Sequence, residues 1–112
     1  MFRTAKFYVL LMLVMGIFAC KSKFAPVPGH LIQPKKFTLI LTDIRLAEAN
    51  QKIMTQHGLR ESNYIDSSYH LIYHLHNVSV KDVEESYEFY VFHPEWMDKI
   101  TNDVIDNLNH LD

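Results

Sequence analysis

Two histidines of the sequence stand at a spacing that could hold a metal ion. His70 and His74 are four residues apart in a segment whose apolar spacing predicts a helix, so both imidazoles would project from one face. Imidazole is a common zinc ligand, and His57 or His76 could add a third. No glutamate follows the first histidine, so the HExxH arrangement that activates a metal-bound water is absent. The alternative is a pair of histidines on a solvated helix face, and we expect no bound metal and no other cofactor.

The sequence also lacks the motifs that place a nucleophile or a pair of acids around a substrate. Ser86 is not part of a GxSxG elbow, and no glycine-rich nucleotide-binding motif is present. Glu84, Glu85 and Glu88 lie close together, but no signature places them on opposite sides of a substrate. A charged, solvated helix face explains them, and we expect a protein without enzymatic activity.

The role of the single cysteine, Cys20, is inferred from the residues that precede it. Arg3 and Lys6 precede the apolar run 7–19, which is the layout of an export signal and is shorter than the ~20 residues of a membrane-spanning helix. The run ends in Ile-Phe-Ala-Cys, which resembles a bacterial lipobox. This pattern predicts a signal peptide over residues 1–19, cleavage before Cys20 and a covalent lipid on its sulfur. The alternative is an uncleaved signal anchor with a free or buried thiol.

Composition and charge exclude some classes of binding partner. Removal of residues 1–19 takes away two of the eleven basic residues and none of the thirteen acidic ones, so the formal charge moves from −2 to −4. An acidic domain is a poor match for nucleic acid, which calls for a basic patch. One cysteine excludes an internal disulfide and a CxxC redox pair. We expect a membrane, reached through the lipid, and a protein of the envelope as partners, and no nucleic acid.

A tether is expected between the lipid and the folded domain. Residues 20–33 contain Pro26, Pro28 and Gly29, which disfavour a helix and favour an extended, flexible chain. The residues just after Cys20 include no acidic cluster and no aspartate beside the cysteine. That composition favours a location on the periplasmic face of a bacterial outer membrane.

The rest of the chain, residues 34–112, carries four stretches with helical spacing of apolar residues. Pro34 and Pro94 suit the first turn of a helix, and Ser79 with Asp82 resembles a capping box. The helices are expected over residues 34–54, over 64–77, from 80 to about 92, and from 94 through the C-terminal stripe that ends near 111. The sequence thus predicts an all-α fold: a small bundle of about four amphipathic helices after a signal peptide and an extended tether.

Aromatic side chains with polar tips are numerous for so small a domain. Tyr87 and Tyr90 fall in the apolar stripe of the third helix and are expected in the core, whereas Phe92 and Trp96 near the next helix junction are candidates for binding a partner. Asp43, beside the apolar stripe of the first helix, could hydrogen-bond to Ser86, Tyr87 or Tyr90 across the bundle or belong to a recognition groove. The possible partner-binding residues are therefore Asp43, Phe92 and Trp96.

Three short motifs together resemble a known family. They are the lipobox, the segment 41–49 (LTDIRLAEA), and residues 86–90 (SYEFY) followed by His-Pro-Glu at 93–95. This combination resembles the lipoprotein family of Bacteroidota catalogued as domain of unknown function 4296, from the lipid site to the C-terminal helix. The resemblance implies an all-helical envelope lipoprotein with no established biochemical activity.

These observations favour a non-enzymatic, lipid-anchored envelope protein that acts as an interaction or accessory module. The alternative is a lipoprotein that binds a metal or a small ligand through the histidine-rich second helix.

Overall fold

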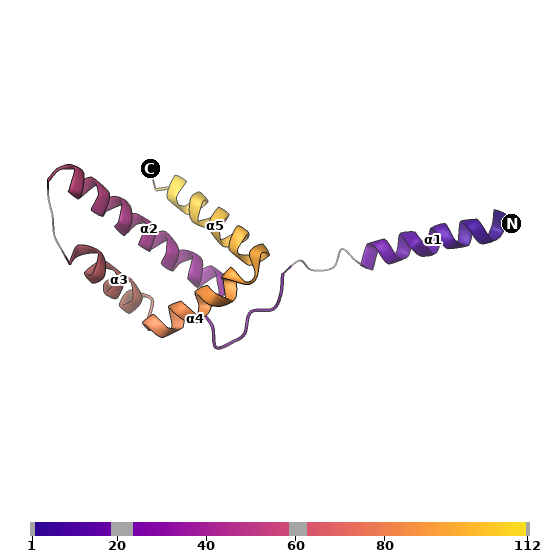
Figure 1. Cartoon of the computed structure of the whole chain (residues 1–112), viewed down its shortest axis with the longest axis horizontal. Coiled ribbons are helices and arrows are strands. Elements are labelled where there is room, and N and C mark those ends of the chain that lie inside the picture. The colour runs from indigo at the N-terminus through magenta and orange to yellow at the C-terminus, as the bar shows by residue number, and fades with distance from the viewer. Residues whose placement is uncertain (1, 19–23, 59–62, 112) are drawn as a thin grey trace.

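The computed structural model describes residues 2–18, 24–58 and 63–111, and within these ranges the chain is all-α with five helices and no strands. Their bounds are α1 Phe2–Phe18, α2 Pro34–Gln56, α3 Tyr64–Leu75, α4 Val80–Val91 and α5 Pro94–Asn109 (Figure 1). The predicted fold class is therefore confirmed. The predicted lipid site, Cys20, lies outside the described residues.

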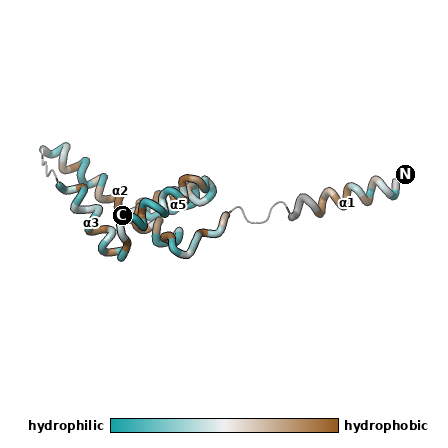
Figure 2. Tube along the Cα trace, turned by 60° about the horizontal axis from the view of Figure 1, so that its bottom comes forward, coloured by the Kyte–Doolittle hydropathy of each residue, from teal (hydrophilic) through white to brown (hydrophobic). Residues whose placement is uncertain are grey.

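Helix α1 corresponds to the predicted export signal and stands apart from the other helices (Figures 1 and 2). Its side chains are exposed from Arg3 to Val14, including a run of large apolar groups. In the part of the chain that the structure describes, no helix combines the length and the apolar character needed to cross a membrane.

The helix ends follow the local sequence signals. The capping box at the start of α4 is formed: the Asp82 N–H donates to Ser79 Oγ and the Ser79 N–H donates to Asp82 Oδ2, each at 3.0 Å. Helix α3 ends at Leu75, two residues before the predicted end, and Asn77 then adopts a left-handed conformation with φ of 55°. Asparagine tolerates this conformation better than most residues, so the chain can turn there toward α4.

Helix α2 is the central element, with α3 along one side and α5 along the other (Figure 1). Asp43 and Glu48 of α2 meet His76 and Tyr69 of the α3 region in reverse order, so α2 and α3 are antiparallel. Helix α5 instead runs parallel to α2, because α4 crosses the N-terminal end of α2 and returns the chain to that end (Figure 1). The result is a hairpin of α2 and α3, with α4 crossing it and α5 packed parallel to α2, and not an up-and-down bundle.

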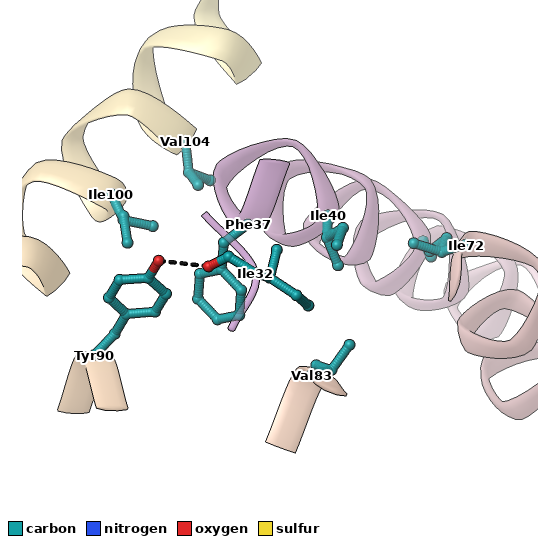
Figure 3. Packing of buried hydrophobic residues seen from close by; sticks show 9 residues of the cluster. Ile32, Phe37, Ile40, Ile72, Val83, Tyr90, Ile100 and Val104 are labelled. Atoms are coloured by element: carbon teal, nitrogen blue, oxygen red, sulfur yellow. Dashed lines mark hydrogen bonds between the residues drawn. The ribbon is translucent and has the colours of Figure 1, made fainter. Parts of the chain in front are cut away.

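The core lies where α2, α4 and α5 converge (Figure 3). Phe37, Ile40, Tyr90 and Ile100 are fully buried, and the rings of Phe37 and Tyr90 are 4.8 Å apart. The expectation that Tyr87 also lies in the core is wrong, since its side chain is 53% exposed. Helix α4 crosses the other helices, so only a narrow strip of its surface is covered, and Tyr87 falls beside that strip.

Candidate functional site

The described segment before α2 is not helical; it contains a turn at Gly29 and His30 and is packed against the domain. We call residues 24–33 the docked segment. Its best-held residue is Ile32, which is only 7% exposed. The Ile32 N–H donates to Ser86 Oγ at 2.9 Å, and the Tyr90 hydroxyl donates to the Ile32 carbonyl at 2.6 Å (Figure 3). Two side chains one turn apart on α4 thus satisfy both backbone groups of one residue.

A second attachment lies nearer the predicted lipid site. Trp96 Nε1 donates to the carbonyl of Ala25 at 2.6 Å, and the rings of Phe24 and Trp96 are 4.6 Å apart. Trp96, which the sequence suggested as a partner-binding residue, is therefore used within the chain. The sequence predicted an extended, flexible tether over residues 20–33; in the part of it that the structure describes, residues 24–33, hydrogen bonds from α4 and α5 hold Ile32 and Ala25 against the domain.

The junction between α4 and α5 projects the most exposed aromatic side chain of the helical domain. Phe92 caps the C-terminus of α4 and is 74% exposed. The next residue, His93, stacks on Phe89 with ring centroids 4.1 Å apart, and its Nδ1 lies 2.7 Å from the Phe89 carbonyl oxygen. A shallow pocket of about 410 Å³ lies beside this junction; its lining is His30, Leu31, Glu85, Glu88, Phe89, Phe92 and His93.

Asp43 has a different partner from those expected. Its Oδ2 lies 2.7 Å from Nε2 of His76, the residue that follows α3, and it makes no hydrogen bond with Ser86, Tyr87 or Tyr90. The expected contact across the bundle is wrong because α4 crosses near the start of α2, whereas Asp43 lies farther along and faces α3. The Asp43–His76 pair joins the end of α3 to the middle of α2.

The histidine pair of α3 is solvated. His70 and His74 are both exposed, and His57 is exposed as well, while His76 is engaged with Asp43. Within residues 2–18, 24–58 and 63–111, no three His, Cys, Asp or Glu side chains come together as a metal site would require. The pair alone does not form the closed set of ligands that a structural zinc site needs.

Ser86 is buried and is hydrogen-bonded to backbone groups of this chain. Besides accepting from Ile32, its hydroxyl donates to the Asp82 carbonyl at 2.7 Å, and its side chain is fully buried. Both its donor and one acceptor position are therefore occupied by backbone groups of this chain. A nucleophilic serine needs an accessible hydroxyl beside a base, which this arrangement does not offer.

A groove of about 480 Å³ lies between α2 and α5. Most of its lining is apolar, and one residue of α4 closes its side; the lining is Leu41, Ile44, Arg45, Glu48, Tyr87, Met97, Thr101, Val104, Ile105 and Leu108. The sequence interpretation missed this groove. The apolar stripes of the first and last predicted helices contain half of its residues, but only the parallel packing of these helices brings the two stripes together.

Charged groups line part of the groove. Arg45 and Glu48 pair across one helical turn with N to O at 3.3 Å. Glu48 also accepts a hydrogen bond from the Tyr69 hydroxyl at 3.0 Å. Burial of the Tyr69 side chain and this bond to a carboxylate both raise the pKa of Tyr69. Glu48 thus connects the groove to α3.

Comparisons with known proteins give one match. A protein-family model described as a domain of unknown function (DUF4296) matches residues 28–112. The matched region begins inside the docked segment, six residues before α2, in agreement with the packing of that segment. Searches of curated proteins and of solved structures found no match.

Proposed function

The chain belongs to the DUF4296 family, and from this premise we propose that it is a non-enzymatic lipoprotein of the bacterial envelope that binds a protein partner in the α2–α5 groove. In this proposal the lipid is attached to Cys20 and the domain faces the periplasm from the outer membrane of a member of the Bacteroidota. The motif Ile-Phe-Ala-Cys behind a charged and apolar N-terminus supports the anchor. Two or three acyl chains on one cysteine would hold the protein lastingly.

The observation that carries the binding function is the composition of the groove. Tyr87 and Ile105 are 53% and 50% exposed there, although each carries a large apolar surface. Tyrosine and methionine are enriched at protein interfaces, and Met97 contributes a flexible side chain to the same groove. Exposed apolar groups of this kind gain free energy when a partner removes them from water.

The shape and charge of the groove favour an amphipathic helix as the bound element. Two parallel helices, α2 and α5, form an elongated apolar channel of the type that accepts the apolar face of a third helix. Arg45 and Glu48 place one charge of each sign at the channel, where they can select the register of the bound helix.

The test is crosslinking and affinity purification from native membranes with matched variants. Ile105→Glu places a charge in the groove, whereas Leu71→Glu changes a similarly exposed residue, 58% against 50%, on α3 outside it. We expect the wild type and Leu71→Glu to recover the same partner, and Ile105→Glu to lose at least about 90% of it, a loss of about 1.4 kcal/mol in binding free energy.

Recovery of the wild type only as a free monomer would remove the binding function. Equal recovery of the partner by Ile105→Glu would show that the interface lies outside the groove. A Cys20→Ala variant separates anchoring from binding, because it should leave the membrane fraction and still bind the partner when both are in solution.

A further inference from the structure

The point at which the chain leaves the domain toward Cys20 is set by the docked segment. Phe24 and Ala25 are held against Trp96, at the start of α5. In Figure 1 the chain departs from the domain beside the turn between α4 and α5. We call the end of the domain that carries Phe24, the partly buried Trp96, and the exposed residues Val91 and Phe92 of the α4–α5 junction the corner.

The chain between the lipid site and the corner is short. Cys20 and Phe24 are four residues apart, and an extended chain advances at most about 3.6 Å per residue, which gives a reach of about 14 Å. By comparison, α2 has 23 residues and a length of about 35 Å. A lipid on Cys20 therefore holds the corner close to the bilayer surface, while the far end of α2 is free to lie well away from it.

The corner also exposes the side chains that suit a bilayer surface. Phe92 is 74% exposed, and Val91 and Phe24 are 47% and 39% exposed. Trp96 is partly buried and its Nε1 is bonded to Ala25, so only part of its ring can contribute to the affinity of aromatic rings for the headgroup region.

The charged residues that are near the corner in the sequence are of both signs. Lys21 and Lys23 follow the cysteine in the sequence, and anionic headgroups attract basic residues beside an anchor. Glu88 and Glu95, near the same helix junction, oppose that attraction. The apolar and aromatic groups are thus the main source of affinity, and the surface should accept zwitterionic as well as anionic lipid.

We propose that the corner docks on the bilayer that holds the lipid of Cys20, with Phe92 inserted at the level of the headgroups. This inference rests on the lipid anchor of the proposed function and adds the orientation of the domain. The N-terminal ends of α2 and α5 then face the membrane, and their C-terminal ends point away from it. The α2–α5 groove is presented to partners in the periplasm and is not covered by lipid.

Trp96 is the only tryptophan of the chain, so its fluorescence reports on the corner directly. The experiment uses the full lipidated protein in vesicles of phosphatidylethanolamine and phosphatidylglycerol in which part of the lipid is brominated near the headgroup. We expect at least a twofold quenching of Trp96 emission relative to vesicles without bromine. Phe92→Ser should lose about half of this quenching or more. The control Ile53→Ser, an equivalent change of an exposed residue near the far end of α2, should retain it.

The mass of the N-terminal peptide is measured on the same sample, so that two kinds of failure are distinguished. Lipid on Cys20 together with unquenched Trp96 would overturn the docking and leave the proposed function intact. Equal quenching in Phe92→Ser and the wild type would also overturn it, because proximity alone would then explain the signal. Absence of lipid on Cys20 would remove the anchor and this inference with it.

Discussion

At the residue scale, Ile32 and the two α4 side chains bonded to it join the docked segment to the core. Ser86 and Tyr90 are fully buried, and their hydroxyls are bonded to the N–H and the carbonyl of Ile32. Removing either hydroxyl would leave a buried backbone group without a partner, which costs about 1–3 kcal/mol. Burial also raises the pKa of Tyr90 to about 12 from its ordinary value of 10.0.

We predict that Tyr90→Phe lowers the free energy of unfolding by about 1–3 kcal/mol, because the Ile32 carbonyl loses its hydrogen bond. Urea denaturation at neutral pH measures this change. The control is Tyr87→Phe, whose side chain is half exposed, and it should change the free energy by less than about 0.5 kcal/mol. Equal effects of the two substitutions would contradict the role assigned to Tyr90.

The same residue predicts a dependence of stability on high pH. The unfolded chain loses the Tyr90 proton near pH 10.0, whereas the folded chain keeps it to about pH 12. Between these values the unfolded state binds fewer protons, so the stability contributed by Tyr90 is present below pH 10.0 and is lost as the pH rises toward 12. Wild type should therefore lose stability more steeply than Tyr90→Phe in this interval, as measured by urea midpoints. Parallel pH profiles would exclude the effect.

At the scale of the elements, the position of α4 determines that α5 packs parallel to α2. It is only 12 residues long, and it must be positioned well because Ser86 and Tyr90 both lie on it. Its capping box satisfies orphan N–H groups of the first turn. The hydrogen bonds from the Ser79 backbone and side chain lower the pKa of Asp82, so this contribution is present above the ordinary pKa of 3.8 and is lost as the pH falls through the lowered value.

We predict that Ser79→Ala destabilises the domain by about 1 kcal/mol, because α4 loses the side chain of its N-cap. Thermal unfolding followed by circular dichroism measures the change. Ser67→Ala, an exposed serine inside α3, is the matched control and should leave the midpoint unchanged or raise it slightly, since alanine is the better helix former. A midpoint for Ser79→Ala as high as that of Ser67→Ala would show that tertiary packing alone positions α4.

At the scale of the whole molecule, the docked segment makes the tether part of the folded domain. The contacts of Ile32 with α4 and of Ala25 with α5 close loops of more than fifty residues. A chain held in this way has one defined exit toward Cys20, beside the α4–α5 junction. A lipid on Cys20 would therefore limit the orientation of the domain at the membrane as well as its location.

We predict that a chain beginning at Pro34 is much less stable than one beginning at Phe24. The shorter chain loses the burial of Ile32, worth about 1.5–3 kcal/mol, and leaves Ser86 and Tyr90 without these partners. For a domain of this size each kcal/mol shifts the midpoint by about 4–8 °C, so we expect a fall of at least about 10 °C in a thermal melt. Identical midpoints would show that the docked segment contributes nothing to stability.

The sequence alone determined the helices of this protein, because their signals are local. Helical spacing of apolar residues, prolines at first turns and the Ser79–Asp82 cap predicted the start of α2, α3, α4 and α5 correctly and their ends to within about two residues. The motif at Cys20 is equally local, since it depends on consecutive residues. The lipid itself remains a prediction, because Cys20 lies outside the described residues.

Only the tertiary structure decided which side chains are covered and what the polar groups meet. Tyr87 and Tyr90 belong to the same stripe, yet the crossing angle of α4 buries one and exposes the other. The pairing of Asp43 with His76, the groove between the parallel helices and the docking of residues 24–33 join residues far apart in the chain. Composition favours an extended chain after Cys20, but whether that chain is free or docked depends on hydrogen-bond partners that the folded helices alone provide.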